Sequence, residues 1–287
     1  MVRLIDGDIA SVEVLEWKGL HVFHGGMSSC SQKLRIFLNV KDIEWQGHEM
    51  NLAAGETYSE WFLGLNPRGL VPVLILDGAV HIESNDIMAL LDEKFPGPRL
   101  FPADRVTEIA GLLQQEDDLH LDLRALSFRF VMGRTDSNKT PEMLARYRGG
   151  ERTVNGAPDH ASRAREIGFY ERLAADGITD DAARASAAKF RAAFEAMEQR
   201  LASAPYFLGP DLGVMDIAWF VYASRLHYAG YPFARLHPRV HAWRRALAED
   251  PRFAREVEPP PAVRETIAAN HAAWTEADTT FTDVTGF

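Results

Sequence analysis

The sequence predicts an α/β domain followed by an all-helical domain, and three observations support this prediction. Between Leu20 and Phe95, the apolar patterns follow the order β-α-β-α-β-β-α. The next stretch, PGPRLFPADR, is rich in proline and glycine, which is typical of a linker. Beyond this linker the apolar pattern becomes helical.

The first predicted strand is LHVFH, residues 20–24, and a helix follows after two glycines. Ser28 or Ser29 is the expected N-cap, because a serine oxygen can accept a hydrogen bond from the first turn of a helix. Leu34, Phe37 and Leu38 recur at helical spacing and predict one buried face.

The rest of this domain is predicted from turn signals and short apolar runs. IEWQGHEMNL predicts a second strand, and YSEWFLGLN predicts a short helix that ends before Pro67. VPVLIL and AVHI flank Asp77-Gly78, a preferred two-residue hairpin turn. A third helix is expected from Ser84 to Phe95, with Ser84 as its cap.

The second domain is predicted to be helical over several long stretches. These are residues 103–131, 182–201, 214–228, 238–248 and 262–274, of which 214–228 is apolar enough for a central buried helix. Residues 133–181 are polar and poorly periodic, which predicts that they are partly loop. The tail, residues 275–287, has little helical character, so we expect it to wrap over the body or to be disordered.

Composition excludes several classes of partner. The chain has 31 Lys and Arg against 41 Asp and Glu, a net charge of −10, and no dense basic tract. Neither nucleic acid nor an anionic membrane is therefore expected as a partner. No apolar run reaches the length of a membrane span, and the first residues lack the apolar core of a signal peptide. A single cysteine fits a reducing cytoplasm.

Several catalytic patterns are missing from the sequence. It contains no Walker loop, no dinucleotide-binding glycine fingerprint, no Gly-x-Ser-x-Gly elbow and no Cys-x-x-Cys pair. Acidic residues surround His120 in the stretch 116–124, and a solvated or dimer-facing helix side explains them better than a metal site does. His237 and His241 are four residues apart but lack the Glu of a zinc-protease pattern, so we expect no metal site.

The stretch HGGMSSCSQKLRIFLNV places Ser28, Ser29 and Cys30 at a predicted helix start. A helix N-terminus stabilises an anion, and a thiolate is an anion. Either Cys30 is itself the thiolate, or a serine hydroxyl donates a hydrogen bond to the thiolate of a bound cofactor. The structural alternative is that Ser28 only caps the helix and Cys30 is only a small buried residue.

Two further patterns lie in the same domain. Pro72 stands directly before a predicted strand, where a cis peptide bond would turn the Val71 main chain outward as a hydrogen-bonding edge. Glu83 and Ser84 stand where a strand enters a helix. The Ser84 hydroxyl and the first N–H groups of that helix could hold a carboxylate.

In this order and spacing, the chain resembles the cytosolic glutathione transferases from about residue 20 to residue 259. The resemblance implies a thioredoxin-like domain that binds glutathione as co-substrate, followed by an all-helical domain that binds the second substrate. It implies that Ser28 activates the thiol and that Val71-Pro72 pairs with the cysteinyl part of glutathione. Glu83-Ser84 would hold the γ-glutamyl end. Asp216 matches the family's helix-capping acid, with Gly213 in place of the usual Ser or Thr.

The domain boundaries expected from this resemblance complete the organisation. They are an N-terminal extension at 1–19, the thioredoxin-like domain at 20–97 and a linker at 98–104. The helical domain then covers 105–260, and a C-terminal extension covers 261–287. The family is usually dimeric, so a homodimer or heterodimer is expected.

The pattern Ser-x-Cys-Ser-x-Lys at residues 28–33 is similar to three branches of the family. These are zeta-type maleyl isomerases, reductive dehalogenases of chlorinated hydroquinones, and bacterial enzymes that cleave β-aryl ethers derived from lignin. The long second domain favours a bulky aromatic electrophile, with ether cleavage ahead of dehalogenation. A binding protein or an inactive partner subunit is the non-enzymatic alternative.

Overall fold

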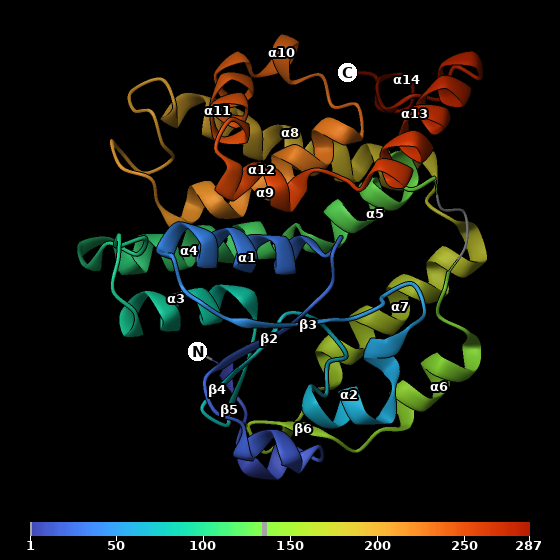
Figure 1. The fold of residues 1–287 in the computed structure, drawn as a ribbon. Helices are drawn as coiled ribbons and strands as arrows, with labels where there is room; N and C mark the ends of the chain where they lie inside the picture. The colour runs from blue at the N-terminus through green and yellow to red at the C-terminus, as the bar shows by residue number, and fades with distance from the viewer. Residues whose placement is uncertain (1, 134–136) are drawn as a thin grey trace. The chain divides into compact units, whose positions relative to one another are not determined.

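The computed structural model describes residues 2–133 and 137–287, and the chain forms two compact units (Figure 1). Of the described residues, the first comprises 2–98 and 137–175, and the second comprises 99–133 and 176–287. These units differ from the expected boundaries. Residues 137–175 belong to the α/β unit, although the helical domain was predicted to run without interruption over 105–260.

The first unit is built on a five-stranded sheet with the strand order β1-β5-β4-β2-β3. Its strands are β1 (Val2–Arg3), β2 (Leu20–His24), β3 (Gln46–Glu49), β4 (Val73–Leu76) and β5 (Ala79–Ile82). β3 runs parallel to β2, and the other pairs are antiparallel. The hairpin predicted at Asp77-Gly78 is confirmed, and both turn residues have positive φ, 49° and 83°.

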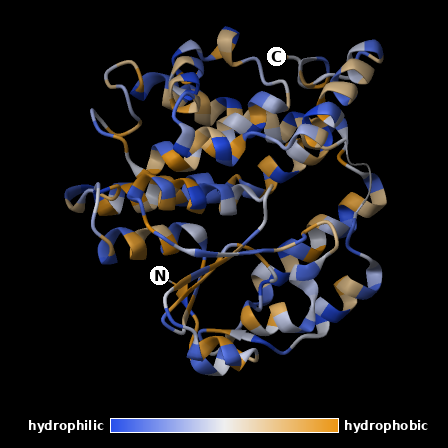
Figure 2. Cartoon of the chain, in the orientation of Figure 1, coloured by the Kyte–Doolittle hydropathy of each residue, from blue (hydrophilic) through white to orange (hydrophobic). Residues whose placement is uncertain are grey.

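Helices cover both faces of this sheet. α1 (Ser29–Lys41) and α3 (Ser84–Lys94) lie on one side, and α2 (Glu60–Leu65) lies on the other (Figure 1). The apolar face predicted for α1 is confirmed, since Leu34, Phe37 and Leu38 are fully buried. Figure 2 shows hydrophobic residues along the strands, whereas the helices alternate hydrophobic and hydrophilic residues, as one-sided packing requires.

Residues 2–19, which belong to the expected extension 1–19, form part of this core. β1 pairs with β5, and two 3₁₀ turns follow at Asp6–Asp8 and Val12–Glu16. The segment contributes Leu4, Ile9 and Val14 to the hydrophobic cluster on the α2 side of the sheet. The thioredoxin-like unit is therefore larger than the predicted 20–97.

Residues 137–175, the inserted segment, are more ordered than the predicted loop. They contain α6 (Pro141–Gly149), a small hairpin of β6 (Thr153–Val154) and β7 (Ala157–Pro158), and most of α7 (His160–Asp176). The hairpin turn is Asn155-Gly156, and both turn residues have positive φ. Residues 134–136 of the predicted loop lie outside the described residues.

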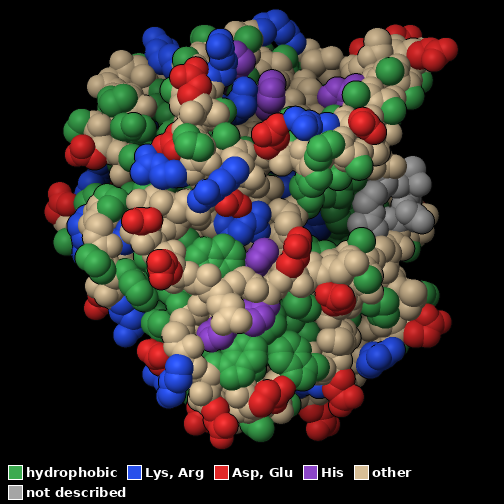
Figure 3. All heavy atoms as spheres, in the orientation of Figure 1, with side chains coloured by type: hydrophobic (Ala, Val, Ile, Leu, Met, Phe, Trp, Pro, Cys, Tyr) green, Lys and Arg blue, Asp and Glu red, His purple; other side chains and the backbone are tan. Residues whose placement is uncertain are grey.

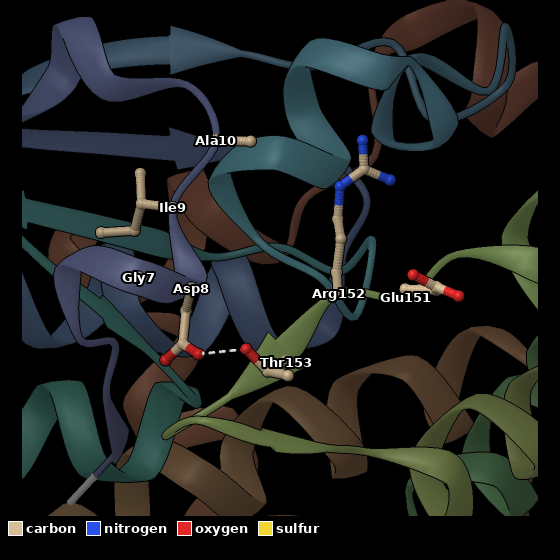
Figure 4. A pocket seen from close by; sticks show the side chains of 7 residues that line it. All are labelled: Gly7, Asp8, Ile9, Ala10, Glu151, Arg152 and Thr153. Carbon is tan, nitrogen blue, oxygen red and sulfur yellow. Dashed lines mark hydrogen bonds between the residues drawn. The ribbon is translucent and has the colours of Figure 1, made fainter.

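Asp8 ties this hairpin to the N-terminal segment. Its carboxylate, 4% exposed, accepts hydrogen bonds from Thr153 Oγ1 (2.6 Å), Asn155 N (2.7 Å) and Gly156 N (3.0 Å). Figure 4 shows Asp8 pointing at Thr153 beside a surface groove that is also lined by Glu151 and Arg152. The inserted segment is thus anchored by a buried charge that stands at the beginning of the chain.

The second unit is helical in its described residues. It consists of α4 (Val106–Asp118), α5 (His120–Phe130), α8 (Asp180–Arg200), α9 (Val214–Tyr228), α10 (Phe233–Leu236), α11 (Pro238–Ala248), α12 (Pro251–Val257), α13 (Pro261–Glu276) and α14 (Phe281–Thr285). α9 is central, as predicted, and contacts α4, α5, α11 and α12. The helix predicted over 103–131 is divided at Leu119 into α4 and α5.

The C-terminal tail forms a helix and not a disordered end. α14 packs against α8, and the Phe281 ring, 2% exposed, contacts the rings of Phe130 and Tyr231. Thr280 and Asp283 form a capping box at the start of α14. A five-residue helix is too short for hydrophobic periodicity to reveal it.

Candidate functional site

The sheet register brings the predicted site segments to one end of three neighbouring strands. Phe23 of β2 pairs with Val73 of β4, and Val73 pairs in turn with Ile82 of β5. Adjacent strands lie about 4.8 Å apart. The chain leaves β2 toward Ser28, enters β4 from Val71-Pro72 and leaves β5 toward Glu83-Ser84. All three segments therefore lie at the same end of the sheet.

Ser28 is the N-cap of α1, as predicted. Its Oγ accepts a hydrogen bond from Ser31 N at 3.3 Å, and its carbonyl accepts from Gln32 N at 2.8 Å. The side chain is half-buried. Since Oγ acts as an acceptor toward the helix, its hydroxyl hydrogen can still be donated to a ligand.

The loop before Ser28 is held in place by side chains of α1. Arg35 donates from Nη1 to the Gly25 carbonyl at 3.2 Å and from Nη2 to the Gly26 carbonyl at 3.1 Å. Ser31 Oγ accepts from Gly25 N at 3.2 Å. A Cβ at Gly25 would lie 2.6 Å from Leu52 Cδ1, so a larger residue here would have to displace the Leu52 side chain.

Ser29 and Cys30 occupy the first two positions of α1. Ser29 is 8% exposed, and Cys30 is half-buried. Of the three small side chains at the helix start, Ser28 and Cys30 are more accessible to a ligand than Ser29.

The Val71-Pro72 peptide bond is cis, which confirms the prediction. Pairing of β4 begins at Val73, so the Val71 main chain lies outside the sheet ladder. The preceding loop is braced by the buried Asn66 side chain, which accepts from Arg68 N at 3.0 Å and donates to the Leu70 carbonyl at 2.8 Å. This leaves a fixed stretch of main chain beside the start of α1.

Glu83, and not Ser84, occupies the N-cap position of α3. Its φ is 69°, an uncommon conformation for a residue with a side chain, and Ser84 is the first helical residue. Ser84 is 6% exposed. The first N–H groups of a helix have no partner within it, so this helix start offers donors to a carboxylate. The Glu83 side chain beside it supplies a negative charge.

Arg68, which no sequence pattern indicated, lies next to the predicted site residue Glu83. Its Nη1 is paired with Glu83 Oε1, and its Nε lies 2.5 Å from Asp159 Oδ2 in the inserted segment. Burial lowers the pKa of Arg68, but the two carboxylates outweigh burial and raise it. Burial raises the pKa of Asp159, but Arg68 outweighs that effect and lowers it. Arg68 and Asp159 therefore form an ion pair of charged groups at neutral pH.

Tyr147, from α6, contacts the same loop. Its hydroxyl donates to the Arg68 carbonyl at 3.0 Å, and burial raises the pKa of this hydroxyl. A local sequence pattern could not reveal these contacts, because Arg68 and Asp159 are 91 residues apart. The only available signal was the sequence Pro-Asp-His at 158–160, in which Asp159 is a typical helix cap.

Other types of site receive no support from the described residues. Residues 2–133 and 137–287 contain no cluster of three His, Cys, Asp or Glu side chains that could hold a metal ion. No helix in this part of the chain has the length and hydrophobicity needed to cross a bilayer. Figure 3 shows acidic and basic side chains interspersed over the face in view, without a large patch of one sign.

Two family models match the chain. The model for the glutathione S-transferase N-terminal domain matches residues 27–94, and the model for the glutathione S-transferase C-terminal domain matches residues 180–246. The first range contains Ser28, Val71-Pro72 and Glu83-Ser84. The inserted segment lies between the two matched ranges.

Curated relatives and solved structures agree with these matches. A zeta-class glutathione S-transferase of Euphorbia esula is 38% identical over 96 residues, 33% of this chain and 43% of that protein. A maleylacetoacetate isomerase of Mus musculus is 42% identical over 79 residues, 27% of this chain and 37% of that protein. The chain thus spans less than half the length of these two relatives.

The crystal structure of the β-etherase LigF from a Sphingobium species is similar in fold. Its TM-score is 0.67 with 22% sequence identity, and the match covers 83% of this chain and 98% of that one. At this level of identity, the similarity shows a shared fold for both the α/β and the helical parts.

Proposed function

Because this chain belongs to the cytosolic glutathione S-transferase superfamily, we propose that it binds glutathione and uses Ser28 to stabilise the glutathione thiolate. The observation that carries this proposal is the convergence of Ser28, Val71-Pro72 and Glu83-Ser84 at one end of three paired strands. These segments supply a hydroxyl donor, an unpaired stretch of main chain and a charged helix start.

The residues fit the chemistry of glutathione. Its γ-glutamyl end carries an ammonium and a carboxylate, which suit the Glu83 side chain and the N-terminus of α3. Its cysteinyl amide suits the Val71 main chain, as a strand suits the edge of a sheet. Its thiolate suits the Ser28 hydroxyl at the N-terminus of α1.

Stabilising the thiolate makes the thiol reactive at neutral pH. A free thiol has a pKa of about 8.5, and lowering it by about two units requires roughly 2.7 kcal/mol. One charge-assisted hydrogen bond of about 1.5–3 kcal/mol, together with the positive end of a helix, supplies this amount.

For the acceptor, we propose an aromatic electrophile, specifically a β-aryl ether. The thiolate sulfur forms a bond to the carbon that carries the aryloxy group. The carbon–oxygen bond breaks, and the phenolate leaves with the electron pair and takes a proton from solvent. The Ser-x-Cys-Ser-x-Lys pattern at 28–33 and the fold shared with a β-etherase support this choice.

The second candidate is isomerisation of a maleyl compound, which is favoured by the similarity to a maleylacetoacetate isomerase at 42% identity. In that reaction the thiolate adds to the double bond and is expelled after rotation, so glutathione is not consumed. Glutathione consumption therefore distinguishes the two candidates.

The deciding experiment incubates the protein with glutathione and either a β-aryl ether or maleylacetoacetate. Mass spectrometry then detects phenol, glutathione adduct and isomerised product. Equal amounts of phenol and adduct support ether cleavage, and isomerised product without glutathione loss supports the second candidate. If the protein binds glutathione but yields neither product, both acceptor proposals are wrong. If it does not bind glutathione, the proposed function fails as a whole.

We also propose that the enzyme acts as a dimer in the reducing cytoplasm, as the family and the single cysteine suggest. Sedimentation equilibrium tests the dimer, since a mass of 32.1 kDa would identify a monomer.

A further inference from the structure

Arg68 connects three parts of the first unit. It lies in the loop that leads to the cis Val71-Pro72 peptide, it pairs with Glu83 at the start of α3, and it pairs with Asp159 in the inserted segment. Its main-chain N–H and carbonyl are also hydrogen-bonded, to Asn66 and Tyr147. The guanidinium position is therefore fixed from several sides.

The Asp159 carboxylate is also held in a fixed position. It precedes α7, and its Oδ1 accepts from Ser162 N at 3.3 Å while Oδ2 binds Arg68. Its side chain is 18% exposed, and that of Arg68 is 20% exposed. A planar guanidinium that binds one carboxylate through Nε and another through Nη1 is held in a fixed orientation.

The charges of this cluster do not cancel. One guanidinium between two carboxylates leaves a net charge of −1. Glu83 uses Oε1 toward Arg68, and its side chain remains 35% exposed. Because Arg68 is shared with Asp159, it neutralises Glu83 less than it would in a simple ion pair. The cluster therefore keeps negative charge available for a cation next to the N-terminus of α3.

We propose that Asp159 is a positioning residue for the ammonium group of the glutathione γ-glutamyl end. This proposal rests on the proposed function and extends the glutathione site into the inserted segment. Asp159 holds Arg68 and shares its charge, so that Glu83 accepts a hydrogen bond from the ligand ammonium. The α-carboxylate of the ligand binds at the N-terminus of α3, beside Ser84.

The inserted segment is anchored firmly enough for this role. Lys139 Nζ lies 4.0 Å from the centre of the Tyr58 ring, and Tyr58 stacks obliquely on Tyr147 with ring centres 5.0 Å apart. Asn138 donates to the Leu52 carbonyl at 3.0 Å. Together with the Asp8 bonds, these contacts fix α6 and the start of α7 against the loop that carries Arg68.

The test compares glutathione with N-acetylglutathione, which lacks the ammonium charge, in the wild type and in Asp159→Asn. Dissociation constants are measured by calorimetry, with a competing ligand for the weaker complexes. We expect the wild type to prefer glutathione at least tenfold. Asp159→Asn should bind glutathione roughly tenfold more weakly and N-acetylglutathione about as well as the wild type does, so the preference nearly disappears.

The matched control is Glu171→Gln. It removes another ion pair of the same segment, Arg148–Glu171 at 2.5 Å, away from Arg68, and should leave both dissociation constants unchanged. Equal weakening of both ligands by Asp159→Asn would show a purely structural role and overturn the proposal. An unchanged preference, or a wild type that does not discriminate between the ligands, would overturn it as well. Failure of the wild type to bind glutathione would overturn the proposed function itself.

Discussion

At the scale of single residues, the proposed function assigns two uses to the single hydroxyl group of Ser28. The oxygen accepts the capping hydrogen bond from Ser31 N, and the hydrogen is left for the ligand. A helix cap uses the hydroxyl oxygen as an acceptor, whereas stabilising a thiolate uses the hydroxyl hydrogen as a donor. A single serine can therefore do both at once. An alanine at this position would lose both interactions, and a test of Ser28 must separate them.

We expect Ser28→Ala to lower kcat/KM for glutathione-dependent turnover by roughly tenfold to a hundredfold, which corresponds to about 1.4–2.7 kcal/mol of lost thiolate stabilisation. The pH midpoint of kcat/KM should rise toward the pKa of a free thiol, about 8.5. Steady-state kinetics between pH 6 and 9 (about the range in which thiols titrate) measures both effects.

Ser59→Ala is the matched control, because Ser59 caps α2 in the same unit by accepting from Phe62 N at 3.2 Å. It should cost about 1 kcal/mol of stability, as loss of the Ser28 cap does, without a shift of the pH midpoint. If Ser28→Ala retained full activity, the thiol-activating role would pass to Ser29 or Cys30.

At the same scale, local sequence patterns predicted some site residues and missed others. The cap at Ser28 was predictable because the serines directly precede a helical apolar pattern. The cap at Glu83 was not, because glutamate seldom adopts positive φ and only the tertiary fold holds it there. The Asp77-Gly78 turn was predictable for the opposite reason, since both residues tolerate that conformation.

At the scale of elements, the inserted segment depends on buried charge for its attachment. Burial raises the pKa of Asp8, but the hydrogen bonds from Thr153, Gly156, Ile5 and Asn155 outweigh burial and lower it. A lowered folded-state pKa means that the stabilising contribution is present above the unfolded value of about 4. It is lost as the pH falls through the folded value.

We therefore expect Asp8→Asn to destabilise the β6–β7 hairpin by about 1–2 kcal/mol at neutral pH. Hydrogen exchange of the amides of residues 153–157 reports this opening, and acidification should produce the same opening in the wild type. Asp6→Asn, an exposed acid in the same 3₁₀ turn, should leave that exchange unchanged. Faster exchange in both variants would show that the hairpin responds to net charge and not to the Asp8 bonds.

α9 of the second unit depends on a second buried acid. Asp216 is fully buried and accepts from Phe207 N (2.9 Å), Gly213 N (3.0 Å) and Trp243 Nε1 (2.9 Å). The acidic half of the capping box is thus present. Its reciprocal half is missing because Gly213 has no side chain.

We expect Asp216→Ala to reduce the free energy of unfolding by about 3 kcal/mol, because it leaves buried N–H donors without an acceptor. Burial raises the pKa of Asp216 to about 6, against the effect of its three donors. The difference in free energy of unfolding between the wild type and Asp216→Ala should therefore be largest below pH 4 (about the unfolded pKa). It should decrease as the pH rises through the pKa that Asp216 has in the folded protein. Denaturant titrations at several pH values measure this. The exposed Asp211→Ala is the control, and an equal loss of stability there would contradict the assignment.

Elements with long, regular patterns were predictable, and those defined by distant contacts were not. α8, α9 and α11 closely match their predicted ranges because hydrophobic periodicity is strong over many residues. The break at Leu119 has no glycine or proline signal. β1 has two residues, and only its pairing with β5 makes it a strand.

At the scale of the whole molecule, the proposed glutathione site should appear as a pattern of protection. We expect glutathione at about a hundred times its dissociation constant to stabilise the protein by roughly 2.7 kcal/mol. Hydrogen exchange should slow at residues 25–31, 69–72 and 83–87, which share one end of the sheet, and at the start of α7. N-acetylglutathione should protect the start of α7 less. Uniform protection throughout both units would contradict a localised site.

The two-part organisation was predictable from the linker and from the change of apolar pattern. The course of the chain between the units was not, because periodicity reports which residues are buried and not what they are buried against. Residues 137–175 were predicted as a partly irregular segment of the helical domain. Their packing partners, Arg68, Tyr58 and Asp8, belong to the first unit, which the local pattern does not reveal.

The discontinuity of the first unit has a consequence for its biosynthesis. A ribosome delivers the chain from its N-terminus, and domains usually fold as they emerge. Here the sheet, α1, α2 and α3 emerge first, then α4 and α5 of the second unit, and only afterwards the inserted segment. Arg68 and Asp8 are therefore synthesised well before their partners Asp159 and Thr153, and part of the second unit is made in between. Until that point Arg68 has Glu83 but lacks its second carboxylate, and Asp8 has the Ile5 N–H but lacks its donors from the hairpin. The first unit is therefore completed only after part of the second has been synthesised.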